Sequence, residues 1–242
     1  MSDAATNFVL MLTERDVTIP DALEVYTRLA ERDLHDLHHI AVKDVGADPG
    51  LLGDVTDAAH ADGRSVLLEV ADMSARGQEA GVQLAIDLGV EKVVATWRED
   101  FLDALKSDDA PQYWPFLGAL SGSPLRLGSS AEELYALADE LGRESGVGGV
   151  VLMPYRQEAH EPSQLLAAVT AAATAPVLVA GGVSETAQIE RIARAGAWGF
   201  TMGSALLGDR QHDPASVGRR ISDVLRACRT ASRPVLGRTS GK

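Results

Sequence analysis

Two ionisable residues stand at the ends of neighbouring apolar runs. Lys43 follows Ile40-Ala-Val, and Glu69 follows Val66-Leu-Leu. Burying a lysine or a glutamate without a partner is costly, so we expect both side chains to be paired or functional. As acid and base, the pair could move a proton beside a carbonyl group. Two other interpretations stay open: Lys43 could form a Schiff base with a carbonyl substrate, or the pair could be a structural ion pair.

Further polar residues follow the apolar runs at comparable positions. Asp44 comes directly after Lys43 and could orient it or cap the next helix, so it joins the candidate catalytic residues. We expect Thr13, Tyr155 and Arg156 to bind substrate. Because a guanidinium suits a carboxylate or a phosphate, Tyr155 and Arg156 are placed at the far end of the substrate.

Two glycine-interrupted turns indicate a site for an anion. The apolar segment 177–180 breaks at Gly181, Gly182 and Val183, and the segment 199–202 breaks at Gly203 and Ser204. Glycine lets the backbone approach an anion closely and tolerates positive φ. Amides at these turns, helped by the dipole of a short helix from Ser204, could hold a phosphate. The alternative is that these glycines only make tight turns.

The elements that must position these residues follow from alternation along the chain. Short apolar runs alternate with segments of helical period, which is typical of parallel strands buried on both faces. Eight strand–helix units predict a single (β/α)₈ barrel over residues 1–232, with a short extra helix after strand eight and a flexible tail at 233–242. An open doubly wound sheet is the alternative. The predicted strands are Phe8–Leu12, His39–Lys43, Ser65–Val70, Lys92–Trp97, Tyr113–Leu117, Gly149–Met153, Val177–Ala180 and Gly199–Met202.

Helix ends carry their own signals. Ser130 with Glu133 predicts a capping box, and Ser184 is the predicted N-cap of the helix that follows strand seven. Glycines that follow helical segments predict left-handed C-caps. These glycines are Gly63, Gly89 and Gly196.

The paired turns resemble those of the ribulose-phosphate-binding barrel superfamily. The matching residues are Ala180-Gly181-Gly182-Val183 and Met202-Gly203-Ser204-Ala205-Leu206. This resemblance implies a (β/α)₈ barrel that binds phosphate with its last two loops. It does not imply a reaction, because the catalytic motifs of individual members, such as the Asp-x-Lys-x-x-Asp of hexulose-phosphate synthases, are absent.

Composition narrows the classes of partner. A formal charge of −13 argues against binding nucleic acid or an anionic membrane over a broad surface. No apolar stretch reaches the length of a membrane span, and we expect a cytoplasmic protein, for which a homodimer is possible. The single cysteine, Cys228, permits no disulfide within the chain, and the spacing of the six histidines suggests no zinc site. We therefore expect neither cofactor nor metal.

Together these patterns predict an enzyme that acts on a small phosphorylated carbonyl metabolite, as an isomerase, an epimerase or an aldolase. A non-catalytic phosphometabolite sensor is the first alternative. The second is a prenyltransferase-like barrel that binds a diphosphate, for which Glu14 and Asp16 could supply magnesium ligands.

Overall fold

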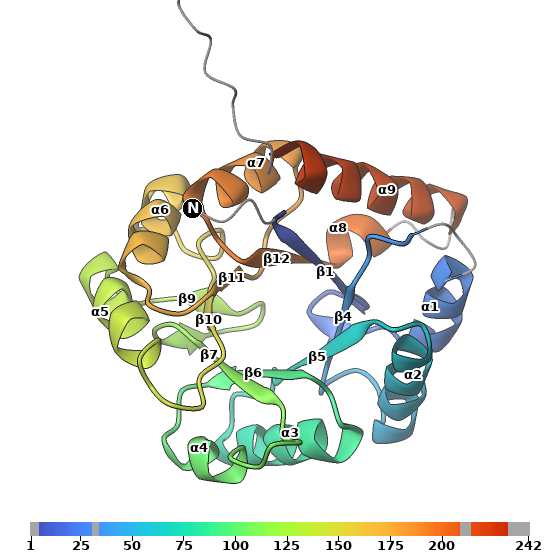
Figure 1. Cartoon of the computed structure of the whole chain (residues 1–242), viewed down its shortest axis with the longest axis horizontal. Coiled ribbons are helices and arrows are strands. Elements are labelled where there is room, and N and C mark those ends of the chain that lie inside the picture. Colours follow the sequence, from blue (N-terminus) through green and yellow to red (C-terminus); the bar gives the residue numbers. More distant parts are fainter. Residues whose placement is uncertain (1–4, 31–33, 209–213, 232–242) are drawn as a thin grey trace, which may run out of the picture.

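The computed structural model describes residues 5–30, 34–208 and 214–231, and its core is a closed parallel barrel. The strand order is β1-β12-β11-β10-β7-β6-β5-β4, with helices forming a ring around the strands (Figure 1). The predicted (β/α)₈ fold is therefore confirmed. The barrel strands are β1 (Asn7–Met11), β4 (His39–Lys43), β5 (Ser65–Glu69), β6 (Lys92–Thr96), β7 (Gln112–Phe116), β10 (Val150–Leu152), β11 (Val177–Val179) and β12 (Gly199–Met202).

The strands form where the sequence places its short apolar runs, and their side chains fill the barrel or pack under the helices. Val9, Ile40, Leu68 and Phe200 are completely inaccessible to solvent. Burial on both faces explains why these strands read as continuous apolar runs instead of alternating ones. Each predicted boundary lies within one residue of the observed one.

Strand β7 contains a proline, which is unusual in a barrel strand. Pro115 lies in register with Ala95 of β6, and β7 makes five registered pairs with β6. On its other side β7 makes a single registered pair with β10, Phe116 with Val151. Because proline has no N–H to donate, its strand is expected to pair incompletely on one side.

The helices follow the strands in the expected alternation. The predicted capping box at Ser130 and Glu133 is present. The glycines predicted as C-caps all have positive φ. The prediction for Ser184 is wrong: Glu185 is the N-cap, and the Gln188 side chain accepts hydrogen bonds from the Ser184 and Glu185 amides. The helices are α1 (Ala22–Ala30), α2 (Pro49–Ala61), α3 (Ala75–Leu88), α4 (Asp100–Ala104), α5 (Ala131–Leu141), α6 (Pro162–Ala172), α7 (Thr186–Ala195), α8 (Ser204–Leu207) and α9 (Pro214–Ala231).

Two small antiparallel ribbons, which the sequence did not predict, are inserted between a barrel strand and the helix that follows it. One joins β2 (Thr13–Glu14) to β3 (Val17–Thr18), and the other joins β8 (Leu120–Ser121) to β9 (Arg126–Leu127). Because both follow the carboxyl ends of their strands, they add to the end of the barrel where sites form in this fold. The predicted tail at 233–242 lies outside the described residues.

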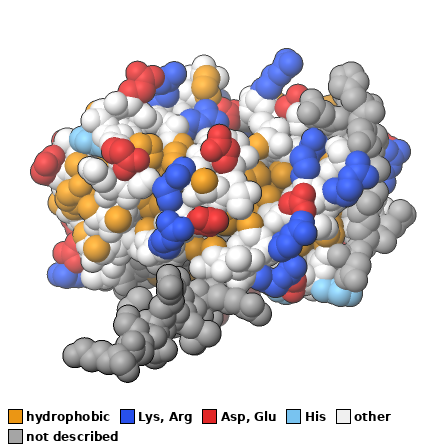
Figure 2. Space-filling model, turned by 90° about the horizontal axis from the view of Figure 1, so that it is seen from above, with side chains coloured by type: hydrophobic (Ala, Val, Ile, Leu, Met, Phe, Trp, Pro, Cys, Tyr) orange, Lys and Arg blue, Asp and Glu red, His pale blue; other side chains and the backbone are white. Residues whose placement is uncertain are grey.

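The outer face carries charges of both signs. Figure 2 shows Lys and Arg side chains interspersed with Asp and Glu on the face seen from above. On α7, for example, Arg194 and Glu190 form an ion pair at 3.0 Å. Of the helices in the described part of the chain, none combines the length and the apolar character needed to cross a membrane.

Candidate active site

A cavity of about 270 Å³ opens at the carboxyl ends of the strands. Its wall combines the two glycine turns with the ionisable residues of the neighbouring strands, so the separate sequence signals meet in one place. The lining residues are Met11, Thr13, Asp16, Lys43, Glu69, Leu125, Met153, Arg156, Ala180, Gly181, Gly182, Val183, Ser184, Thr201, Met202, Gly203, Ser204 and Ala205.

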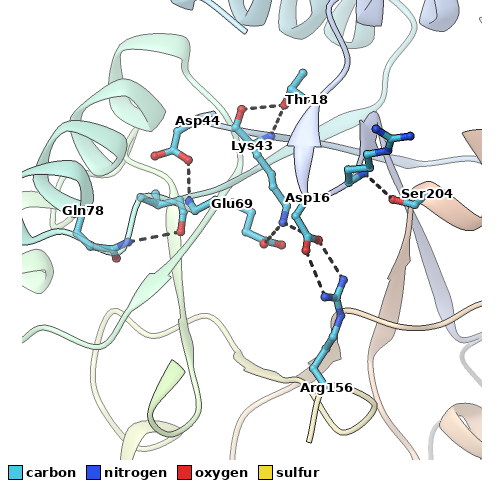
Figure 3. Close-up of polar contacts among 11 residues, drawn as sticks. Asp16, Thr18, Lys43, Asp44, Glu69, Gln78, Arg156 and Ser204 are labelled. Atoms are coloured by element: carbon cyan, nitrogen blue, oxygen red, sulfur yellow. Dashed lines mark hydrogen bonds and ion pairs between the residues drawn. The ribbon is translucent and has the colours of Figure 1, made fainter. Parts of the chain in front are cut away.

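Lys43 and Glu69 form a buried ion pair in this cavity. They end adjacent strands in direct register, and Lys43 Nζ lies 2.9 Å from Glu69 Oε1 (Figure 3). Only 6% of Lys43 and 5% of Glu69 is exposed, so water screens the pair weakly. The expected juxtaposition of these two residues is thus observed.

The environment of Lys43 favours its charged form. Burial by itself lowers the pKa of Lys43, but the charge and the hydrogen bond of Glu69, with a smaller effect of Asp16, outweigh burial and raise this pKa above its ordinary value. A lysine attacks a carbonyl only as the free amine, whereas an ammonium group donates protons and stabilises negative charge. The geometry therefore favours the acid role of Lys43 over the Schiff-base role.

Asp16 links this pair to Arg156. Its carboxylate accepts two hydrogen bonds from the Arg156 guanidinium, at 3.0 and 3.2 Å, and lies 3.6 Å from Lys43 Nζ (Figure 3). Sequence reasoning considered Asp16 only as a possible magnesium ligand beside Glu14. The sequence did not predict the β2–β3 turn, which brings Asp16 back over the cavity.

That turn holds two non-glycine residues in a left-handed conformation. Arg15 has φ of 51° and Asp16 has φ of 65°. For residues with a Cβ atom this conformation costs about 1–2 kcal/mol each. Such strain persists where the surrounding contacts impose it, and it is concentrated at functional sites.

The two glycine turns face the same cavity and carry free amides. Gly181 and Gly182 have φ of 72° and 78°. In the described part of the chain, the amides of Gly182, Val183, Ser204 and Ala205 donate no hydrogen bond to another protein group. Backbone amides that converge on one cavity form an anion-binding surface.

Close packing behind these turns requires glycine. A Cβ atom on Gly182 would lie 2.9 Å from Tyr155 Cβ, and one on Gly203 would lie 2.5 Å from Thr13 Oγ1. Because α8 is only four residues long, its dipole is small, and the amides of the turns are the main attraction for an anion.

Two candidates lie elsewhere than expected. Asp44 does not line the cavity: its Oδ1 accepts a hydrogen bond of 2.7 Å from the Ala71 amide, so it holds the end of β5 instead of orienting Lys43. It does not cap α2 either, whose N-cap is Asp48. Burial raises the pKa of the Asp44 carboxyl.

Tyr155 and Arg156 also differ from the expectation. Tyr155 packs behind Gly182 and does not line the cavity. Arg156 does line it, but beside the first glycine turn instead of at the far end: a Cβ atom on Gly181 would lie 2.8 Å from Arg156 Cγ. Its guanidinium thus lies between the glycine turns and Lys43.

Sequence reasoning missed the remaining wall of the cavity. Thr201, a buried polar residue within β12, faces the cavity, as do three methionines and Leu125 of the β8–β9 ribbon. A lone polar residue in an otherwise apolar strand is the signal that could have identified Thr201. The other residues look like ordinary core, and only the fold shows that they face a cavity.

Comparison with known proteins defines the fold. The sequence matches no protein-family model, and no curated protein matches it. Solved structures resemble it along almost the whole chain. A tryptophan synthase from M. tuberculosis has a TM-score of 0.62 at 18% identity, with 94% of both chains covered. A thiamine phosphate pyrophosphorylase from Pyrococcus furiosus has a TM-score of 0.60 at 11% identity, covering 93% of this chain and 96% of the other.

A protein from Aquifex aeolicus VF5 aligns similarly, with a TM-score of 0.56 at 13% identity over 95% of this chain and 94% of the other. At these identities the likeness establishes the fold alone. The (β/α)₈ barrel that the resemblance of the glycine turns implied is thus confirmed as the fold.

Proposed function

We propose that this protein is an enzyme that moves a proton on a small phosphorylated carbonyl metabolite. The observation that carries the proposal is the shared cavity: the glycine turns at 181–183 and 203–205 and the Lys43–Glu69 pair all line it. A phosphate held by the turns would place a short carbon chain against that pair. The two named structural neighbours, a synthase and a pyrophosphorylase, are themselves enzymes, which is consistent with this proposal.

The proposed reaction divides the work between the two buried charges. The Glu69 carboxylate accepts the proton from the carbon next to the carbonyl group. The Lys43 ammonium stabilises the negative charge that develops on the carbonyl oxygen and can donate its proton there. The proton then returns to one of the two carbons, which gives an isomer or an epimer. Burial strengthens both interactions because water competes poorly for them.

Solvent exchange tests this reaction across many candidate substrates at once. The protein is incubated in D₂O with a panel of three- to six-carbon ketose and aldose phosphates, and deuterium incorporation is followed by NMR. We expect exchange with at least one compound, and a decrease of about 10²–10⁴-fold in the Glu69→Gln variant. Exchange that is equal in this variant would eliminate the mechanism.

Two further outcomes separate the alternatives. Because the Lys43 amine is kept protonated, we expect borohydride to trap no substrate on the protein; irreversible trapping would indicate a Schiff-base aldolase. Tight binding of a phosphorylated compound without exchange or conversion across the panel would indicate a sensor instead of an enzyme.

A further inference from the structure

The tip of the β2–β3 ribbon is held at Arg15 and at Asp16, and both residues contact residues of the proposed ligand site. The Arg15 amide donates a hydrogen bond of 3.2 Å to Ser204 Oγ, in the second glycine turn. The Asp16 carboxylate accepts one hydrogen bond from each terminal nitrogen of the Arg156 guanidinium. Figure 3 shows the hydrogen bonds between Asp16 and Arg156 and the hydrogen bond to Ser204.

We infer that this ribbon is a latch whose Asp16 carboxylate occupies Arg156 until the phosphate of a ligand replaces it. The inference rests on the proposed phosphate site and adds a residue and a movement to it. Arg156 has two roles in turn: in the free protein it holds Asp16, and in the complex it binds the phosphate together with the amides of the turns.

The position of Arg156 makes such an exchange possible. Its side chain passes directly over Gly181, so the guanidinium needs only a change of rotamer, not of backbone, to reach an anion in the glycine turns. About a quarter of the Arg156 side chain and 29% of the Asp16 side chain are exposed, so the pair can separate without burying an unpaired charge. A phosphate dianion offers this guanidinium more charge than a carboxylate does, in an equally bidentate geometry.

The backbone of the tip favours release. Arg15 and Asp16 both have positive φ, and the ribbon has only two registered pairs, Thr13 with Thr18 and Glu14 with Val17. When a phosphate takes Arg156, the tip loses its hydrogen bonds from Asp16, whereas the Ser204 hydroxyl can donate to the phosphate and still accept from the Arg15 amide. The freed Asp16 carboxylate then has Lys43, already 3.6 Å away, as its remaining cation, which couples phosphate binding to the proton-transfer pair.

Titration with inorganic phosphate at constant ionic strength tests the latch. We expect the Asp16→Asn variant to bind phosphate at least about fivefold more tightly than the wild type, because Arg156 is no longer occupied. In an Arg156→Gln background the same substitution should not increase the affinity for phosphate, because the guanidinium that Asp16 would release is absent. Asp16→Gly, which suits the positive φ, is a second variant that removes the carboxylate and retains the turn.

The outcomes separate the latch from the phosphate site on which it rests. If phosphate binds with equal affinity to the wild type and to both Asp16 variants, the latch is wrong and the site remains. If the gain persists in the Arg156→Gln background, the effect is long-range charge and the latch is again wrong. If phosphate binds to none of the proteins, the phosphate site fails and the latch fails with it.

Hydrogen exchange of the ribbon gives an independent measurement. In the wild type, saturating phosphate should speed exchange of the Arg15 amide, because the tip loses the Asp16–Arg156 hydrogen bonds that hold the neighbouring residue in place. Glu158→Gln is the matched control: it removes one carboxylate that pairs with an arginine, Arg126, in an exposed ion pair of the other ribbon. We expect it to leave both phosphate affinity and ribbon exchange unchanged. Slower or unchanged exchange of the Arg15 amide on phosphate binding would overturn the release of the tip.

Discussion

The two ends of the barrel place lysines in opposite environments: Lys43 is buried, and Lys92 is half-buried. At the carboxyl end, Lys43 is paired with Glu69, and its pKa is raised. At the amino end, Lys92 lies over the ring of Trp198, 5.6 Å from its centre, and burial lowers the pKa of Lys92. One end thus stabilises a buried charge with a partner of opposite sign, and the other end makes the charged form of its lysine less favourable.

Aromatic packing explains the amino end. Trp198 lies 5.0 Å from Trp114 and 5.2 Å from His39, measured between ring centres. These rings close the barrel with large apolar surfaces, which stabilise the fold but solvate charge poorly. We conclude that the amino end is built for stability, whereas the carboxyl end accepts the cost of holding charges close together.

Backbone strain follows the same division. At the amino end, the described turns with positive φ are made by glycines such as Gly63, Gly89 and Gly196, which adopt this conformation freely. At the carboxyl end, Arg15 and Asp16 adopt it despite having side chains. A protein that needed only a tight turn there could use glycine, so the strain indicates that the Asp16 carboxylate is needed.

The largest expected effect comes from replacing one lysine at each end. Lys43→Met leaves Glu69 buried without its nearest cation, and we expect a loss of about 3–5 kcal/mol in the free energy of unfolding. Lys92→Met places an apolar chain against Trp198, so its stability should change by less than about 1 kcal/mol. Urea denaturation measures both values, and equal losses would contradict the contrast between the two ends.

A double variant separates stability from catalysis in this comparison. Lys43→Met combined with Glu69→Leu removes both charges, and we expect it to recover most of the lost stability. It should nevertheless show no deuterium exchange into any substrate that the wild type labels. Exchange at the wild-type rate would show that the pair is structural.

The second prediction compares two glycines with similar backbone conformations. Gly182 at the carboxyl end has φ of 78° and Gly63 at the amino end has φ of 72°, so alanine should cost about 1–2 kcal/mol at either position. Only at Gly182 does the new Cβ meet a neighbour, 2.9 Å away, and there the turn must shift. We expect Gly182→Ala to weaken phosphate binding by about tenfold or more and Gly63→Ala to leave it unchanged, as measured by calorimetry.

The contrast between the ends also marks how far the sequence could predict this molecule. The barrel was predictable because short apolar runs and helix caps such as Ser130 are local signals. Lys43 and Glu69 were predictable as a pair because ionisable residues at the ends of neighbouring parallel strands must meet. The role of Asp16 was not predictable. It depends on a two-residue turn that returns the chain over the cavity and on an arginine 140 positions away in the sequence.

For Asp44 and Tyr155 the sequence predicted a place in the site that the structure does not show. Both are adjacent in sequence to residues that line the cavity, Lys43 and Arg156, and both side chains point elsewhere. Just beyond the end of a strand the chain turns, so neither alternation nor proximity in sequence determines direction. Predictions at strand ends therefore identify the right positions more reliably than the right side chains.

The third prediction concerns pH and the amino end. Burial, with the charges of Lys92 and His38, lowers the pKa of His39 to about 4, and Glu91 opposes this shift. Between about pH 6.5 and 4 the unfolded chain therefore binds more protons at this position than the folded one. The stability from neutral His39 is present above pH 6.5 and is lost as the pH falls toward 4. Allowing for its partial exposure, we expect the loss to be about 1–2 kcal/mol.

The measurement for His39 is the difference between two pH profiles. In His39→Gln, whose side chain does not titrate, the free energy of unfolding should fall less between pH 6.5 and 4 than in the wild type. The carboxylates titrate in both proteins, so their contributions to the free energy of unfolding cancel when one profile is subtracted from the other. Parallel profiles would mean that His39 ionises in the folded protein as freely as in the unfolded chain.

The smallest expected effect lies in the strained turn at the carboxyl end. Asparagine tolerates the left-handed conformation better than arginine does, so Arg15→Asn should raise the free energy of unfolding by a few tenths of a kcal/mol. Arg126→Asn makes the same exchange in the other ribbon, where φ is not positive, and should bring no gain. Because the Arg15 amide and the Asp16 carboxylate are both retained, phosphate affinity should change little. A loss of stability in Arg15→Asn would show that contacts of the arginine side chain, and not the need to place Asp16, hold this turn in its conformation.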